Sequence, residues 1–328
     1  MADRQVYVIL GMQRSGTSAL ARAMSILGVD LGDQLLAPTE LNPSGFWEDK
    51  EGWRINHQFL EISGSEDWIP GLDSTVLRSS KEYQLLFAQA VRLLEERLGR
   101  HPAWAFKEPG TDRLLFFWRE VFAKVGAEEK FLFVLRNPLS IADSLISFIC
   151  LRPMLSYALW LEHSALAIQG TLDRLPVIVG YERLLADPRG QVLRLVEKFN
   201  RSEQMRSAEL ERYADKFLDS SLAHSAYTHN DLALRCRKIP LVIDIYDLLD
   251  RRASDQVDDS AFRQQWAALY GRYEVEFPRL LRDNPWMLDP QARQLRRWRR
   301  WLLRIRQRKM EEIKRLARRA MVKLAGRR

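Results

Sequence analysis

Hydrophobic residues along this chain fall into two patterns: short continuous runs, and longer stretches with an apolar residue every three or four positions. The runs are rich in β-branched and aromatic residues and predict buried strands, whereas the helical spacing predicts amphipathic helices. The predicted strands cover residues 5–10, 103–106, 130–135 and 176–179. The predicted helices cover residues 16–27, 81–99, 112–125, 138–150, 153–172 and 181–199.

The alternation of strands and helices predicts an α/β protein, a three-layer parallel sheet flanked by helices on both faces. Residues 29–75 are rich in Pro, Gly and Asp, and we expect an irregular segment there that serves function. A weaker helical pattern continues from about residue 200 to 285. We therefore predict one domain over residues 1–285 and a basic amphipathic helix over residues 286–328, so that the C-terminal extension is mostly helical.

Positive charge is concentrated at the C-terminus. The chain has a formal net charge of +8, yet residues 291–328 alone hold 16 Lys and Arg against 2 acidic residues. The rest of the chain is therefore net acidic, and the basicity belongs to the tail.

The tail itself predicts a long amphipathic helix, because its apolar residues recur at spacings of three or four and Arg and Lys fill the other faces. Such a helix fits an anionic membrane surface. It fits a partner helix through the apolar stripe as well, and a solvated terminal helix is a further alternative. Nucleic acid is the least favoured partner, because a cationic tail without a recognition fold would supply affinity but no sequence reading.

No signal for export or membrane insertion is visible in the sequence. The N-terminus leads directly into a short apolar run, without the basic region, long apolar region and cleavage site of a signal peptide. No stretch approaches the ~18 uninterrupted apolar residues that span a bilayer. Cys150 and Cys236 match no metal or redox spacing, which predicts reduced thiols. We predict a cytoplasmic protein, either soluble or peripheral at the inner face of a membrane.

Residues 11–18, GMQRSGTS, lie between the first predicted strand and helix, where a phosphate-binding loop belongs. The backbone N–H groups of such a loop and the positive end of the helix converge on an anion. A nucleoside triphosphatase would carry Lys at position 17 to reach the β- and γ-phosphates, but Thr17 stands there and Arg14 is the nearest cation. The loop therefore predicts an anion site and disfavours ordinary ATP hydrolysis.

A second phosphate-binding element is predicted at residues 133–144, FVLRNPLSIADS. Arg136 ends a predicted strand, Asn137 suits the N-cap of the next helix, and Pro138 suits its first position. Ser144 follows two turns into that helix. The guanidinium and the hydroxyl can therefore bracket one phosphate from two directions.

Together these motifs resemble the PAPS-dependent sulfotransferase family, in its bacterial and carbohydrate-directed branches. The pattern R-S-G-T-S resembles the family's 5′-phosphosulfate loop, and Arg136, Pro138 and Ser144 match its 3′-phosphate motif R-x-P-x-x-x-x-x-S. The resemblance covers roughly residues 5–200 and implies a P-loop-type fold. It implies that the sulfuryl donor 3′-phosphoadenosine 5′-phosphosulfate (PAPS) is bound, without a metal ion, by Arg14, Ser15, Gly16, Thr17, Ser18, Arg136 and Ser144. The segment 177–188 also resembles the family, and Tyr181 and Glu182 are expected to support structure there.

The resemblance implies transfer of a sulfuryl group from PAPS to an acceptor hydroxyl. By analogy with phosphoryl transfer, positioning and charge stabilisation should dominate, and a base should take the hydroxyl proton. Residues 42–48 resemble the family's N-x-x-G-x-x-E stretch, which makes Glu48 the first choice as base, with Asp49 and His57 as alternatives. Lys107, in a K-x-P element after a strand, is expected to hold sulfate oxygens together with Arg14. Glu108 is expected either to pair with Lys107 or to touch the acceptor.

Aromatic residues crowd the segment predicted to be irregular, namely Phe46, Trp47, Trp53 and Trp68. Such rings stack on sugars, which favours a carbohydrate or glycolipid acceptor, although they equally suit a loop that forms its own small core. Two other functions stay open. One is a P-loop kinase or nucleotide hydrolase that uses ATP, and the other is a catalytically inactive sulfotransferase-like protein that tethers a partner at a membrane.

Overall fold

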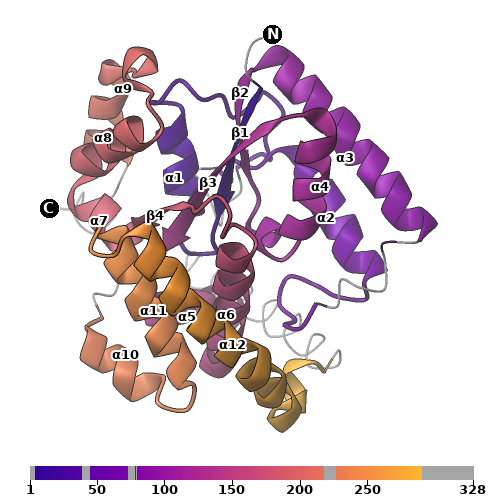
Figure 1. Cartoon of the computed structure of the whole chain (residues 1–328), viewed down its shortest axis with the longest axis vertical. Coiled ribbons are helices and arrows are strands. Elements are labelled where there is room, and N and C mark those ends of the chain that lie inside the picture. The colour runs from indigo at the N-terminus through magenta and orange to yellow at the C-terminus, as the bar shows by residue number, and fades with distance from the viewer. Residues whose placement is uncertain (1–3, 39–44, 73–77, 79, 218–226, 290–328) are drawn as a thin grey trace, which may run out of the picture.

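The computed structural model describes residues 4–38, 45–72, 78, 80–217 and 227–289. Its strands are β1 (Gln5–Leu10), β2 (Ala103–Lys107), β3 (Glu128–Leu135) and β4 (Val177–Gly180). They form one parallel sheet in the order β2-β1-β3-β4 (Figure 1). All the strand predictions are confirmed, because continuous apolar runs are typical of strands that a parallel sheet buries on both faces.

The helices are α1 (Thr17–Met24), α2 (Lys50–Ile62), α3 (Lys81–Arg100), α4 (Leu115–Val125), α5 (Pro138–Ile149), α6 (Pro153–Gln169), α7 (Tyr181–Ala186), α8 (Pro188–Lys198), α9 (Ser207–Arg212), α10 (His229–Arg235), α11 (Pro240–Ala253) and α12 (Asp259–Asp283). Short helical turns are η1 (Pro109–Asp112), η2 (Ser202–Gln204), η3 (Tyr213–Phe217) and η5 (Pro285–Met287). The helix predicted over 181–199 is two helices, since Asp187 leaves the helical conformation and caps α8. Its side chain accepts the backbone N–H of Gly190.

Alternating side chains of the sheet enter two separate cores. Val6 and Val8 of β1 pack in one core with residues of α2 to α6, α11 and α12. Tyr7 and Ile9 pack in the other core with residues of α1, α8 and α9. Figure 1 shows α1, α8 and α9 on one side of the strands and α2, α3 and α4 on the other. The predicted three-layer α/β architecture is therefore confirmed.

The prediction of an irregular segment over residues 29–75 is wrong in part, because α2 lies within it. The carboxylate of Asp49 caps this helix by accepting the N–H groups of Glu51 and Gly52. Ile55 and Phe59, four residues apart, are buried on its inner face. The helical period is short here, and Gly52 and polar residues interrupt it, so the apolar spacing alone does not predict a helix.

The strand order places the candidate site. β1 lies between β2 and β3, so the connection from β1 to β2 and the connection from β2 to β3 run in opposite directions across the sheet. The direction reverses between β1 and β3. In open α/β sheets, ligands bind outside the carboxyl ends of the strands at such a switch point. The loop 11–18, Lys107, Arg136 and Tyr181 each follow or end one of the strands at that edge.

The predicted basic helix over residues 286–328 lies outside the described residues from residue 290 onward, so its membrane or helix partner and the domain boundary at 286 stay predictions. Among the residues that the structure describes, no helix is both long and apolar enough to cross a bilayer.

Candidate active site

A pocket of about 360 Å³ opens at the carboxyl edge of the sheet. The segments after all four strands line it, and so do α2 and the chain that flanks it. Its predicted members are Arg14, Gly16, Thr17, Ser18, Glu48, His57, Lys107, Glu108 and Arg136, and Trp53, Trp68, Phe46, Phe148 and Tyr181 add aromatic walls. The structure thus gathers residues from both predicted anion motifs and from the predicted catalytic set around one cavity.

The loop 11–18 curves tightly between β1 and α1. Gly11, Arg14 and Gly16 have φ of 133°, 72° and 102°, in the left-handed region. Successive backbone N–H groups in such turns form concave anion sites, and α1 begins directly after them at Thr17. The hydroxyl of Ser15 is buried and has no hydrogen-bond partner within the described chain. The backbone geometry therefore fits the anion site that the sequence predicts.

Gly16→Ala is expected to lower the free energy of unfolding by about 2–4 kcal/mol. The left-handed φ disfavours any side chain, and a Cβ at this position would lie 2.1 Å from the ring of Tyr181. Urea unfolding measures the loss. Gly99→Ala is the matched control, because a Cβ there meets no atom within 4 Å, and this helical site should gain up to about 1 kcal/mol. Equal stability of the two variants would contradict the assigned loop conformation.

The second motif meets the first directly. Asn137 caps α5 by accepting the N–H of Leu139, as the sequence predicts. Arg136 Nη1 donates to the backbone oxygen of Arg14 at 2.7 Å, and Arg14 Nε donates to Ser144 Oγ at 2.9 Å. The guanidinium of Arg14 therefore lies beside the second motif, although its backbone belongs to the first. The two segments face one cavity instead of pointing apart.

Two arginine side chains crowd this part of the pocket. Arg136 lies over the ring of Tyr181, 4.7 Å from its centroid, and Arg14 lies 5.1 Å from the ring centroid of Phe148. Burial, and then the charge of Arg136, lower the pKa of Arg14. An anion placed between the guanidinium groups would relieve that repulsion. Tyr181, expected only to support structure, is therefore part of the pocket wall.

Lys107 and Glu48, both predicted to take part in catalysis, lie together in the pocket. Lys107 Nζ lies 2.6 Å from Glu48 Oε1 and donates to the backbone oxygen of Phe46 at 2.9 Å. Ser18 Oγ is 3.4 Å from the same nitrogen, so the ammonium borders the loop 11–18. Both side chains are buried, 3% and 8% exposed. The ion pair links the predicted base to the predicted sulfate-binding cation.

The two alternative bases, Asp49 and His57, lie in different places. Asp49 is buried away from the pocket, where it caps α2 and pairs with Arg97 Nε at 2.7 Å. Asp49 is therefore a structural residue, and its prediction as an alternative base is wrong. His57 does line the pocket, with its ring centroid 4.1 Å from that of Trp53 and Nε2 3.8 Å from Asp67.

Trp47 lies beside Arg22 and packs against the core on the α1 side. Its prediction as one of the aromatic residues at the acceptor site is therefore corrected.

Sequence reasoning missed the support beneath the loop. Asp112 Oδ1 accepts the backbone N–H of Gly11 at 2.9 Å, and its other oxygen lies 3.1 Å from His163 Nδ1. Both side chains are fully buried. Burial raises the pKa of Asp112, against the hydrogen bonds from His163 and Gly11. No sequence pattern pairs these residues, since they come from η1 and α6. Only the position of Asp112 soon after the K-x-P element hints at a role.

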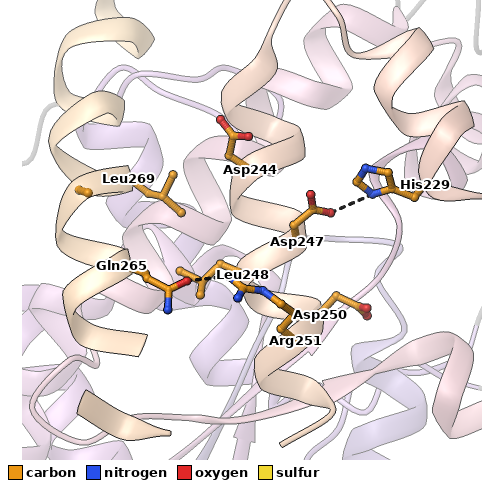
Figure 2. Close-up of a pocket in the computed structure, with 9 residues that line it drawn as sticks. His229, Asp244, Asp247, Leu248, Asp250, Arg251, Gln265 and Leu269 are labelled. Carbon is orange, nitrogen blue, oxygen red and sulfur yellow. Dashed lines mark hydrogen bonds and ion pairs between the residues drawn. The ribbon is translucent and has the colours of Figure 1, made fainter. Parts of the chain in front are cut away.

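A second pocket, of about 600 Å³, opens between α11 and α12 (Figure 2). It holds three aspartates of α11, but each has its own side-chain partner, an arginine or a histidine. The nearest nitrogen–oxygen distances are 3.0 Å for His229–Asp247, 2.6 Å for Arg183–Asp250 and 2.6 Å for Arg272–Asp244. Charges satisfied within the protein mark a structural network, and the candidate site stays at the sheet edge.

Comparisons with known proteins find no matching family, and similar solved structures of low sequence identity. No family model matches the chain, and no curated protein sequence matches it. Among solved structures, it is similar to a sulfotransferase domain from the Synechococcus PCC 7002 olefin synthase, at 15% identity and a TM-score of 0.38, over 83% of this chain and 95% of that one. It is also similar to a sulfotransferase domain from the curacin biosynthetic pathway, at 13% identity and a TM-score of 0.38, over 84% of this chain and 99% of that one.

Proposed function

We propose that this protein is a sulfotransferase that moves a sulfuryl group from PAPS to an acceptor hydroxyl. One observation carries the proposal. The loop 11–18 and the Arg136–Ser144 motif, far apart in sequence, contact each other at one pocket through Arg14. A nucleotide with phosphates at both its 5′ and 3′ positions needs two anion sites in one cavity, and ATP needs only one.

The residues present suit such a donor. The backbone of the loop and the start of α1 would hold the 5′-phosphosulfate, with Thr17 and Ser18, which line the pocket, beside it. Ser15 does not line the pocket, and its buried hydroxyl, without a hydrogen-bond partner among the described residues, would be a further donor. Arg136 and Ser144 would hold the 3′-phosphate. Arg136 Nε is buried without a hydrogen-bond partner among the described residues, so a hydrogen-bond donor remains for an anion.

The proposed reaction is an in-line transfer. The acceptor oxygen forms a bond to sulfur while the bond from sulfur to the bridging phosphate oxygen breaks, and adenosine 3′,5′-bisphosphate (PAP) leaves. Glu48 takes the proton of the acceptor hydroxyl. Lys107 turns from Glu48 toward the sulfuryl and bridging oxygens, where its charge stabilises the transition state. Their 2.6 Å contact supports the assignment, because it places base and cation side by side.

The acceptor that we propose is a carbohydrate or glycolipid. The aromatic side chains of Phe46, Trp53 and Trp68 line the same cavity as Glu48, and aromatic faces suit sugar rings. Trp53 is 36% exposed, so its ring is accessible from solvent. A location at the inner face of a membrane, through residues 291–328, is a further proposal that would bring the protein to lipid-linked acceptors.

The function is tested by incubating the full chain with PAPS and extracts of glycans and glycolipids, followed by mass spectrometry. A product heavier by one SO₃ group, formed in the presence of EDTA, is the expected result. Mg²⁺-dependent turnover of ATP without any sulfated product would instead identify a kinase or nucleotide hydrolase. Tight PAP binding without transfer to any acceptor would identify an inactive binding protein.

A further inference from the structure

Glu108, the residue after Lys107 at the end of β2, places a second carboxyl group in the pocket. It lines the same cavity as Glu48 and is 3% exposed. Glu48 is paired with the ammonium of Lys107, whereas no cation of the described chain lies within ion-pair distance of Glu108. Of the two carboxyl groups in this cavity, Glu48 therefore has a cation beside it and Glu108 does not.

Neutral hydrogen-bond donors fix the orientation of Glu108. The amide of Asn56 donates to Glu108 Oε2 and to Thr111 Oγ1, the latter at 3.0 Å. Trp118 Nε1 donates to the amide oxygen of Asn56 at 2.7 Å, which settles which end of the amide faces Glu108. The backbone N–H of Gly110 is the other donor to this carboxyl group. The orientation is thus set by buried groups of α2, η1 and α4.

The electrostatics favour a protonated group. Burial, followed by the negative charges of Glu48 and Asp67, raises the pKa of Glu108 to about 8, although hydrogen bonds from Asn56 and Gly110 oppose the shift. The titratable side chains that share the cavity with Glu108 are Arg14, Glu48, His57, Asp67, Lys107, Arg136 and Tyr181. The raised pKa of Glu108 favours its protonated form, and a protonated carboxyl group can donate a hydrogen bond.

We propose that Glu108 is an acceptor-binding residue, a protonated carboxyl group beside ionised Glu48 that donates a hydrogen bond to a second oxygen of the acceptor. This inference rests on the proposed function. Glu48 contacts the reacting hydroxyl, and Glu108 contacts the neighbouring oxygen. The pair selects acceptors with two adjacent oxygen atoms, as in the vicinal diol of a sugar ring, over isolated alcohols. Pairs of carboxyl groups with separated protonation states take different roles in one site.

Two variants separate this role from that of a base. Glu108→Gln keeps a neutral hydrogen-bond donor, and Glu108→Ala removes it. Transfer from labelled PAPS into a glycan and glycolipid extract at pH 7 is expected to stay within about threefold of wild type for the Gln variant. It is expected to fall about tenfold for the Ala variant, because one neutral hydrogen bond is lost. Wild-type transfer should decline as the pH rises through about 8, where Glu108 ionises and ceases to donate, and the Gln variant should lack that decline.

Other results would overturn the inference. If Glu108→Gln loses as much activity as Glu48→Gln, Glu108 acts as a base. If Glu108→Ala transfers like wild type, Glu108 does not contact the acceptor. Infrared spectroscopy of the PAP-bound protein gives a readout that needs no turnover: a protonated-carboxyl band should be absent from Glu108→Gln and should titrate near pH 8 in wild type. Its absence from wild type contradicts the inference even if the Ala variant does not fold.

The same experiments distinguish this inference from the proposed function. PAP binding is measured calorimetrically for wild type and for both Glu108 variants. A wild-type protein that binds no PAP, or that binds PAP and transfers nothing, contradicts the proposed function. The infrared band then still reports whether Glu108 is protonated.

Discussion

Replacement of Arg136 by alanine is expected to weaken the binding of PAP by about two orders of magnitude or more. Truncating one partner of a buried, hydrogen-bonded charge pair costs about 2–5 kcal/mol, and each ~1.4 kcal/mol is a factor of ten. Arg136 is half-buried, lies over the ring of Tyr181 and lines the pocket, and its buried Nε is available for a phosphate. A phosphate bound there would form such a pair with the guanidinium. Isothermal titration calorimetry with PAP measures the loss.

Three further variants test the same assignment of the nucleotide site. Arg14→Ala should also weaken PAP binding, since Arg14 joins the loop to Ser144. Arg136→Lys keeps the charge but loses the planar fork, so an intermediate loss is expected. Arg279→Ala removes an exposed arginine of α12 and serves as the matched control, with unchanged affinity. If Arg136→Ala and Arg14→Ala bind PAP as wild type does, the assigned nucleotide site is wrong.

Replacement of Glu48 by glutamine is expected to reduce kcat by about 10²- to 10⁴-fold, the contribution usual for a general base. The amide is nearly the same size but cannot take the acceptor proton. PAP affinity should stay within a few-fold of wild type, because Glu48 contacts Lys107 and not the proposed phosphate ligands Arg136 and Ser144. Single-turnover transfer and PAP calorimetry measure the two quantities separately.

Glu51→Gln is the matched control for this substitution. It changes a carboxylate of the neighbouring first turn of α2, paired with Arg54 and 40% exposed, and should leave kcat unchanged. Full activity of Glu48→Gln would exclude Glu48 as the base and leave His57, of the bases predicted from the sequence, at the pocket. A joint loss of PAP affinity and folding would instead mean that Glu48 serves mainly to neutralise buried Lys107.

The strands and both anion motifs could be predicted from the sequence because their signals are local. β1 is a continuous apolar run that ends at Gly11, and Asn137 and Pro138 mark the start of α5 by their own chemistry. The helix α2 could not be recognised in the same way. The sequence offers its cap Asp49 only as an alternative base, whereas Arg97 from α3 pairs with it in the protein interior.

Contacts between residues that are far apart in the chain could not be predicted from the sequence. Lys107 meets Glu48 only because β2 pairs with β1, opposite Ile9, and so brings the end of β2 beside the loop. Asp112 and His163 meet beneath Gly11 for a similar reason, since α6 packs against η1. The different surroundings of Glu108 and Glu48 depend on such contacts, and the spacing of residues in the sequence does not predict them.

The proposed function depends on a pocket that recognises the 3′-phosphate of a nucleotide as well as its 5′ end. Calorimetric titration of the full chain with PAP and with adenosine 5′-phosphate, both in EDTA, tests this most directly. We expect PAP to bind at least about a hundredfold more tightly, because only PAP can engage Arg136. Equal affinities for the two nucleotides, or binding that requires Mg²⁺, would contradict it.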